Sequence, residues 1–295
     1  MFPNYIEPLF RPPSEANSLI LQVTNGCSWN KCTFCEMYTA PQKKFHLKAQ
    51  EQIEEELIAI ANKKQSIRRI FLADGDAMAL SYRRLADIMF AINKYLPDVQ
   101  RVSSYCLPRN LKNKTVDELS DLYSMGLSLV YIGCETGDDE ILKKINKGET
   151  YQSSLSALQK TRQAGIKRSV MILNGLGGIK YSEQHATNSA RLMNDAQPEY
   201  LSTLVLSFPT GMQHYKNNFG DDFKPLKQLE LAQEMEYFLS ALQLKKTIFR
   251  SDHASNYLLL RGTLNQDKDK LLQIVRSSIS QPGSVPLRQE WQRGL

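Results

Sequence analysis

Residues 19–35, LILQVTNGCSWNKCTFC, join a short apolar run to three closely spaced cysteines. The run at 19–23 suits a buried strand of a parallel sheet, where apolar residues follow one another without alternation. Cys27, Cys32 and Cys35 follow it directly, so we expect them in a loop at the C-terminal end of the strand. That end carries the chemistry in α/β barrels. Such clustering predicts a metal centre rather than disulfides.

Three thiolates suit either zinc or an iron–sulfur cluster. A structural zinc ion takes four protein ligands, and no further Cys or His follows at short spacing, His46 being the next candidate. A four-iron cluster held by three cysteines leaves one iron open for a substrate or cofactor. Two alternatives stay open on the residues alone, namely a non-catalytic iron–sulfur electron carrier and a zinc-binding protein with RNA affinity.

Six apolar runs alternate with six amphipathic stretches over the first two thirds of the chain. The runs predict strands at 19–23, 67–73, 99–105, 127–132, 166–173 and 200–208. The stretches predict helices at 48–64, 81–96, 115–125, 138–146, 151–164 and 182–195. Six strand-then-helix units with right-handed crossovers predict an α/β fold, a partial (β/α)6 barrel.

The chain divides by composition into four parts. Residues 1–17 hold four prolines and are expected to form an extended N-terminal arm, and 18–210 form the core barrel. Residues 211–280 are expected to be a mostly helical C-terminal extension covering the barrel, and 281–295 a loose tail. Beyond the sixth strand we expect a loop at 209–223, helices at 225–244 and 266–279, and irregular or short extended structure at 246–262.

The composition is that of an ordinary globular protein, with 42% apolar and 23% charged residues, which excludes collagen-like and largely disordered chains. The formal net charge of +6 is spread along the chain rather than gathered in a patch, so nucleic-acid binding is not indicated. No apolar run is long enough for a membrane helix, and the first residues lack the apolar stretch of a signal peptide. We therefore expect a cytoplasmic protein without a membrane partner.

With three later motifs, the cysteine triad resembles the radical S-adenosylmethionine (radical SAM) superfamily over residues 18–209. The aromatic Phe34 precedes the third cysteine, as the superfamily prefers, although the first gap has four residues instead of the usual three. Asp74-Gly75-Asp76 follows the second strand, where the family typically has Gly-Gly-Glu.

The other two motifs resemble the branch that contains oxygen-independent coproporphyrinogen oxidases and tRNA methylthiotransferases. Gly133-Cys134-Glu135-Thr136-Gly137 ends the fourth strand, with Lys147-Gly148 further on. Asn174-Gly175-Leu176-Gly177-Gly178 ends the fifth strand.

The resemblance implies an enzyme with one [4Fe–4S] cluster, held by Cys27, Cys32 and Cys35, whose fourth iron is chelated by the methionine part of SAM. One electron, from a donor such as flavodoxin or ferredoxin, cleaves SAM to methionine and a 5′-deoxyadenosyl radical. That radical abstracts hydrogen from a substrate that the sequence does not identify.

The resemblance also assigns SAM contacts. Gly75 through its carbonyl, and Asp74 or Asp76, would accept hydrogen bonds from the methionine ammonium, the alternative being a plain turn with solvated acids. Glu135 would contact the ribose or ammonium, or else serve as a helix-start acid. Phe34, Asn174 and Gly175 would lie near the adenine, the alternatives being core packing and a glycine loop.

The polar segment 247–258 is expected either on the substrate side of the site or as a loop whose side chains satisfy its own backbone. Its candidate residues are Arg250, which suits a carboxylate or phosphate, and Asp252 and His253, which would orient that group or move a proton. Cys106 and Cys134 end neighbouring strands and are expected to be small buried side chains, the alternative being that they are redox-active or bind a second metal. His185 is expected at the surface or as a contact on one helix face.

Overall fold

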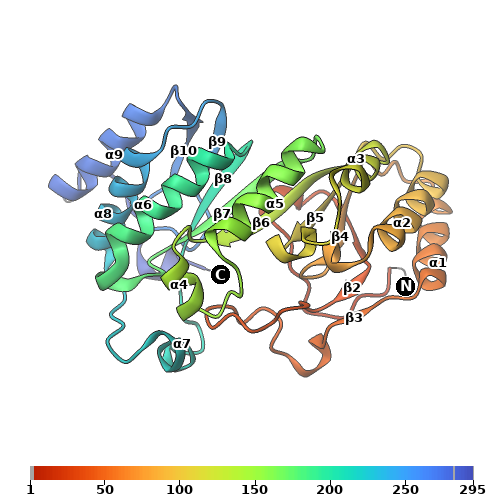
Figure 1. The fold of residues 1–295 in the computed structure, drawn as a ribbon, viewed down its shortest axis with the longest axis horizontal. Helices are drawn as coiled ribbons and strands as arrows, with labels where there is room; N and C mark the ends of the chain where they lie inside the picture. Colours follow the sequence, from red (N-terminus) through yellow and green to blue (C-terminus); the bar gives the residue numbers. More distant parts are fainter. Residues whose placement is uncertain (1–2, 282, 295) are drawn as a thin grey trace. The chain divides into compact units, whose positions relative to one another are not determined.

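Eight strands form one sheet in the computed structural model, which describes residues 3–281 and 283–294 (Figure 1). The strand order is β1-β4-β5-β6-β7-β8-β9-β10. Their bounds are β1 Leu19–Gln22, β4 Arg69–Ala73, β5 Arg101–Cys106, β6 Leu127–Glu135, β7 Lys167–Asn174, β8 Tyr200–Val205, β9 Thr247–Ser251 and β10 Leu260–Leu264. The assigned neighbours pair in parallel except β9 and β10, which are antiparallel. The predicted parallel α/β class is thereby confirmed.

The chain separates into two compact units. The first unit comprises residues 1–30, 35–132 and 156–168, and the second comprises 31–34, 133–155 and 169–295. The tip of the cysteine loop therefore belongs to the second unit, while its two flanks belong to the first. Helix α5, Tyr151–Gln163, contributes residues to both units.

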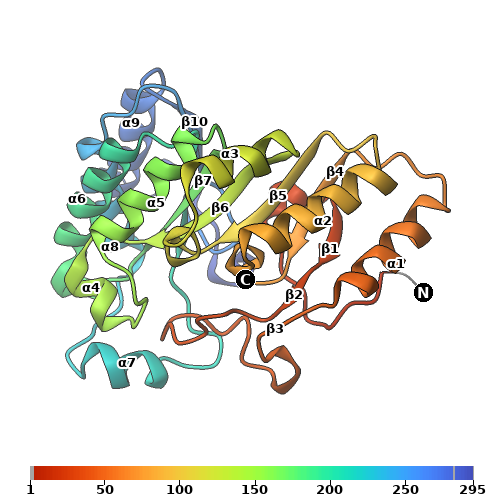
Figure 2. The same ribbon diagram turned by 45° about the vertical axis from the view of Figure 1, so that its right-hand side comes forward.

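In the first unit, helices α1 (Gln50–Ala61), α2 (Tyr82–Tyr95) and α3 (Val116–Ser124) follow the strands in chain order (Figure 2). The expected capping box begins α3, because Thr115 Oγ1 accepts the Glu118 N–H at 3.1 Å and the Glu118 carboxylate accepts the Thr115 N–H at 2.8 Å. The cysteine loop connects β2 (Thr24–Asn25) to β3 (His46–Leu47), and these two strands pair with each other as an antiparallel ribbon.

The N-terminal arm is fixed to the first unit by a buried carboxylate. Glu15, in a short 3-10 turn at Pro13–Glu15, accepts hydrogen bonds from Tyr131 at 2.6 Å and Arg101 at 2.8 Å. Further 3-10 turns lie at Pro41–Lys43, Ala77–Ala79, Pro108–Leu111 and Glu290–Gln292.

In the second unit, helices α6 (Gly178–Ala196), α8 (Gln228–Ala241) and α9 (Lys268–Ser280) pack side by side, α8 in the middle (Figure 1). Helix α4, Asp139–Lys144, follows β6. Two stretches differ from the sequence-based expectation. Residues 246–262 contain β9 and β10, which extend the sheet from six strands to eight because alternate side chains such as Phe249 are fully buried.

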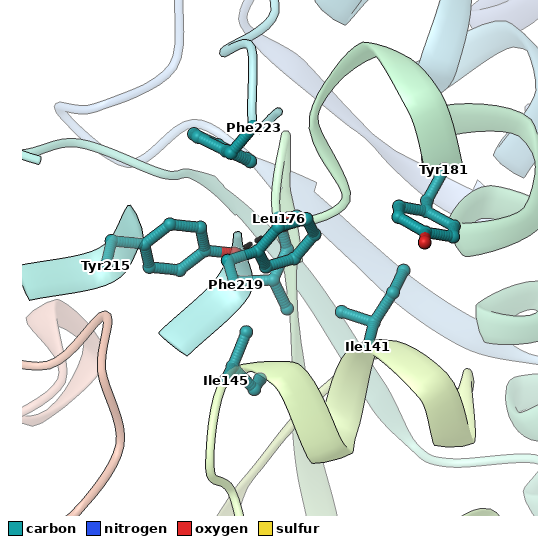
Figure 3. Close-up of a cluster of buried hydrophobic side chains, with 7 residues drawn as sticks. All are labelled: Ile141, Ile145, Leu176, Tyr181, Tyr215, Phe219 and Phe223. Atoms are coloured by element: carbon teal, nitrogen blue, oxygen red, sulfur yellow. Dashed lines mark hydrogen bonds between the residues drawn. The ribbon is translucent and has the colours of Figure 1, made fainter. Parts of the chain in front are cut away.

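The second difference is helix α7, Gln213–Phe219, inside the stretch expected to be a loop. Tyr215 and Phe219 lie one turn apart and are both buried, so the helix packs into a core cluster (Figure 3). We call this the aromatic cluster; its members are Ile141, Ile145, Leu176, Tyr181, Tyr215, Phe219 and Phe223. The Tyr215 hydroxyl donates to the Leu176 carbonyl at 2.5 Å, which ties α7 to the turn after β7 (Figure 3).

No helix in the described part of the chain is both long enough and apolar enough to cross a membrane.

Candidate functional site

None of the five cysteines forms a disulfide; the three predicted ligand cysteines are partly exposed, whereas Cys106 and Cys134 are buried. Burial and the nearby Asp76 raise the pKa of Cys27. Cys106 and Cys134 are each 1% exposed, and burial together with Glu135 raises the pKa of Cys134 to about 12, as expected of inert, buried thiols. Over residues 3–281 and 283–294, no three His, Cys, Asp or Glu side chains are gathered into a group that would hold a metal ion.

The Asp74-Gly75-Asp76 turn holds the start of the cysteine loop within the first unit. Asp74 forms an ion pair with Lys43 and accepts the Gly26 N–H at 3.2 Å. The Gly75 N–H donates to the Gly26 carbonyl at 3.1 Å. A Cβ on Gly75 would lie 2.9 Å from that carbonyl oxygen and 2.7 Å from the Tyr38 ring, so only glycine fits here.

Asp76 binds the loop one residue beyond Cys27. Its carboxylate accepts the Ser28 N–H at 2.9 Å, the Ser28 hydroxyl, and the Asn110 amide at 3.2 Å. Burial raises the pKa of both Asp74 and Asp76, while Lys43 and Ser28 respectively oppose that rise. Both side chains are 0% exposed, so the alternative of a turn with solvated acids is wrong.

The tip of the cysteine loop is held within the second unit. The Thr33 N–H donates to the Ile145 carbonyl at 3.0 Å, and the Asn146 amide donates to the Lys31 carbonyl at 3.1 Å. The Phe34 ring packs against the aromatic cluster, in keeping with the packing alternative for this residue. The loop tip is thus anchored to the end of α4 and to the chain just beyond it.

Glu135 is paired with Lys147, a residue to which the sequence analysis gave no role. Lys147 Nζ lies 3.0 Å from Glu135 Oε1, with both side chains nearly buried. Nζ also lies 5.6 Å from the centroid of the Phe34 ring. Burial alone lowers the pKa of Lys147, but the Glu135 carboxylate and the Cys32 thiol raise it above the ordinary lysine value. Lys147 therefore stays charged beside the loop tip.

The backbone of Glu135 is strained. Its φ is +66°, in the left-handed region, which costs a residue other than glycine about 1–2 kcal/mol. The side chain folds back over Gly133, where a Cβ would collide with the Glu135 carboxylate. Asp138, not Glu135, caps α4, since its carboxylate accepts the Ile141 N–H at 2.9 Å. The helix-start alternative for Glu135 is therefore wrong.

The turn after β7 is held by hydrogen bonds to a buried carboxylate of α8, that of Glu234. Glu234 Oε1 accepts the Gly175 N–H at 2.6 Å, and Oε2 accepts the Ser182 hydroxyl at 2.8 Å. Gly175 has φ +84° and Gly178 has φ +59°, so the turn needs glycine at both positions. Asn174 is 4% exposed and its carbonyl accepts the Leu206 N–H at 2.9 Å. Burial raises the pKa of Glu234 to about 7.

His185 is buried, against the expectation that allowed it at the surface. Its Nδ1 lies 2.8 Å from Thr136 Oγ1, and its Nε2 lies 3.9 Å from Glu234. Burial lowers the pKa of His185 to about 4. The neutral imidazole is therefore hydrogen-bonded to the residue after Glu135, whereas its Nε2 lies near the Glu234 carboxylate without a hydrogen-bond partner among the described residues.

The segment 247–258 is ordered by its own polar groups and by the chain near its end. Arg250 is exposed on β9, opposite Arg261 of β10, and Asp252 binds Arg261 at 2.5 Å. His253 Nδ1 lies 2.9 Å from Ser255 Oγ, and burial lowers the pKa of His253. Arg288 donates to the His253 carbonyl. Asp252 is thus paired with Arg261, and its carboxylate also acts on His253, where it opposes the effect of burial on the pKa.

The site residues that the sequence analysis did not identify are buried charged side chains, namely Lys43, Lys147 and Glu234. Glu234 had a signal, because it falls at helical spacing among Leu231, Met235 and Phe238, all buried. An acid on an apolar helix face needs a partner. Lys147 lay in a quoted motif, and Lys43 had no signal of its own.

Replacing Glu234 by Gln should change how stability depends on pH. Because its pKa is raised to about 7, the stability from the protonated carboxyl is complete below the unfolded value of 4.5 and is lost as the pH rises through 7. The free energy of unfolding of the native protein, minus that of Glu234→Gln, should therefore fall by on the order of 3 kcal/mol between those pH values. Denaturant titrations measure it.

His185 is present in both proteins, so its own titration cancels in this difference. Glu236→Gln, which changes a partly exposed residue of the same helix, serves as the control. A flat difference for Glu234→Gln would contradict the raised pKa of this buried carboxyl.

The comparisons with known proteins agree on a family. The model of the Radical SAM superfamily matches residues 21–192. The heme chaperone HemW of Bacillus subtilis is 26% identical over 159 residues, which cover 52% of this chain and 41% of the relative. An uncharacterized protein of Methanocaldococcus jannaschii is 25% identical over 243 residues, which cover 75% of this chain and 45% of the relative. The chain thus spans less than half the length of these curated relatives.

Among solved structures, coproporphyrinogen III oxidase (HemN) from Escherichia coli, a radical SAM enzyme, superposes with a TM-score of 0.59 at 18% identity. The match covers 76% of this chain and 52% of that one, and shows the fold. The family model spans more than half of the chain, including the cysteine loop and the turns after β4, β6 and β7. The chain belongs to the radical SAM superfamily, whose cofactors are a [4Fe–4S] cluster and SAM.

Proposed function

We propose that this protein is a radical SAM enzyme that cleaves SAM and abstracts hydrogen from a substrate. The observation that carries the proposal is the three-cysteine loop within the family match, because its cysteines are partly exposed and form no disulfide, while the other two are buried. A partly exposed cysteine triad fits a cluster that must meet both SAM and an electron donor. Nothing favours the electron-carrier or zinc alternatives.

When bound, the reduced cluster supplies one electron that cleaves SAM to methionine and a 5′-deoxyadenosyl radical. Cys27, Cys32 and Cys35 are the proposed iron ligands. The turn at 74–76 has a positioning role in this proposal, since both of its carboxylates already bind the chain around the loop start. The Gly75 carbonyl remains the proposed acceptor for the methionine ammonium.

Glu135 is proposed to bind the ribose hydroxyls or the ammonium of SAM through lone pairs that Lys147 leaves free. Its left-handed backbone supports this role, because such strain is found where a side chain must be aimed at a ligand. Asn174 and Gly175 are proposed to line the adenine, with Phe34 packed nearby on the aromatic cluster. Glu234 and His185 would hold these contacts in place.

A reaction of this class needs a reductant, and we propose flavodoxin or ferredoxin in the cytoplasm. The substrate side is proposed to include the segment 247–258. Of its three candidates, Arg250 is exposed and Asp252 is paired with Arg261, so Arg250 is the one available to a ligand from solvent.

The cysteine triad tests the proposal directly. Anaerobically reconstituted protein should hold about four irons and form 5′-deoxyadenosine from SAM after reduction. Changing all three of Cys27, Cys32 and Cys35 to Ala should abolish both, whereas Cys106→Ala should keep both. Iron analysis and chromatography measure the result. A triple variant that retains the cluster, or loaded protein that forms no 5′-deoxyadenosine, would contradict the proposal.

Asp76→Asn should weaken the binding of the cluster rather than the binding of SAM. The change removes the charge that holds both the N–H and the hydroxyl of Ser28, a loss of roughly 1.5–3 kcal/mol. We expect a chelator to bleach the iron chromophore about tenfold faster, with a smaller effect in Ser28→Ala. If bleaching is unchanged and only SAM affinity falls, Asp76 contacts SAM and the positioning role is wrong.

Glu135→Gln should weaken SAM binding about 10- to 100-fold while the cluster stays loaded, through the loss of a charge-assisted hydrogen bond. Glutamine is the informative change, because Glu135→Ala would leave the Lys147 ammonium buried without its partner, at a cost of about 3–5 kcal/mol. Cluster spectra recorded during SAM titration measure the affinity. Glu140→Gln, an exposed change on α4, is the control. Unchanged affinity would remove Glu135 from the SAM contacts.

A further inference from the structure

A cavity of about 260 Å³ lies in the second unit, where several strands meet at one edge of the sheet. Its wall includes the last residues of β7, β8 and β9 and the first residue of β10, which are Asn174, Val205, Ser251 and Leu260. Helix α8 and residues 256–258 contribute mostly apolar side chains, and Gly283 and Leu287 lie against it from the chain's end. Its lining contains no charged side chain.

Asn256 is the polar group that marks this cavity as a binding site. The side chain lines the cavity, is 2% exposed, and its Nδ2 donates to the Thr203 carbonyl at 2.8 Å. Because a carbonyl only accepts, that bond fixes which end of the amide is nitrogen. The Oδ1 of Asn256 has no hydrogen-bond partner among the described residues.

The backbone around Asn256 is held from both sides. Ser255 Oγ accepts the Val205 N–H at 3.1 Å, and Arg288 donates to the Asn256 carbonyl at 3.2 Å. The amide cannot turn over without breaking the bond to the Thr203 carbonyl. A buried acceptor held in place without a donor is unfavourable, and a ligand N–H or O–H would satisfy it.

We propose that this cavity binds an uncharged, largely apolar part of the substrate that carries one N–H or O–H donor, which Asn256 Oδ1 accepts. Calling the ligand part of the substrate rests on the proposed function, whereas the binding of such a ligand does not. Asn174, a proposed adenine contact, is on the same wall. Every other lining residue lies beyond residue 192, outside the stretch that the family model matches, so the cavity suits what is particular to this chain.

An uncharged ligand follows from the lining, because a charged group moved there would lose its hydration without gaining a counter-ion. The volume of the cavity and its leucine-rich wall suit a ring or branched hydrocarbon group rather than an extended polar chain. Arg250 is not on the wall, so a substrate carboxylate or phosphate would have to lie outside this cavity.

The test uses two neutral probes of nearly equal size, indole, which has an N–H donor, and benzothiophene, which has none. Ligand-observed NMR on the cluster-loaded protein should show indole binding about tenfold more tightly, the ratio expected for one neutral hydrogen bond. In Asn256→Leu the two probes should bind equally. No indole binding at millimolar concentration, or an equal ratio in the native protein, would overturn the proposal.

A second variant guards against misfolding of Asn256→Leu. Ala232→Phe fills the cavity from α8, leaves Asn256 in place, and should abolish the binding of both probes, whereas Gln233→Leu on the exposed side of α8 should not. SAM should leave indole binding unchanged. If SAM displaces indole, the cavity holds the adenosyl group and the substrate assignment is wrong. None of these measurements requires 5′-deoxyadenosine formation, so failure here is distinguishable from failure of the proposed function.

Discussion

The part of the site within the second unit depends on the buried ion pair of Glu135 and Lys147. Taking both charges out of water is favourable only when each finds close partners, and the 3.0 Å contact between them supplies the first. Lys147 Nζ also lies 5.6 Å from the centroid of the Phe34 ring, so the pair also helps to hold the tip of the cysteine loop. The pair forces Glu135 into a left-handed backbone and requires Gly133 beneath its carboxylate.

Another arrangement is shared by the turns after β4 and β7. A carboxylate buried at the C-terminal edge of the sheet binds backbone N–H groups of a neighbouring loop: Asp76 binds Ser28, and Glu234 binds Gly175. Carboxylates suit this task because two oxygens accept several donors at once, and such charge-assisted bonds are stronger than neutral ones. The turns after β4 and β7 are thereby held by contacts within the chain itself.

Apart from the short ribbon of β2 and β3, the strands and helices up to β8 were predictable from the sequence. Buried parallel strands read as unbroken apolar runs, and the covering helices have a 3.6-residue period. Helix α7 was missed because seven residues around two aromatic anchors give too short a pattern, and its packing surface comes from α4 and the turn after β7. Strands β9 and β10 were missed as sheet members because alternating polar residues on a short run also read as a loop. The residues of a strand do not by themselves indicate that it pairs with a strand distant in the sequence.

At the site, motifs located Glu135, Asp76 and Gly175 but not the groups that hold them. A ligand-binding motif is local, whereas Lys43, Lys147 and Glu234 act across 12 to 59 positions of sequence. Two kinds of surface result within the second unit. One is the ion pair of Glu135 and Lys147 near the tip of the cysteine loop, which is proposed to bind the zwitterionic cofactor. The other is the uncharged cavity beside Asn256, which is proposed to select its ligand by hydrogen bonding rather than by charge. In the proposed reaction, a ligand suited to one of these sites would be poorly suited to the other, so the cofactor and the uncharged substrate group would be distinguished by their charge.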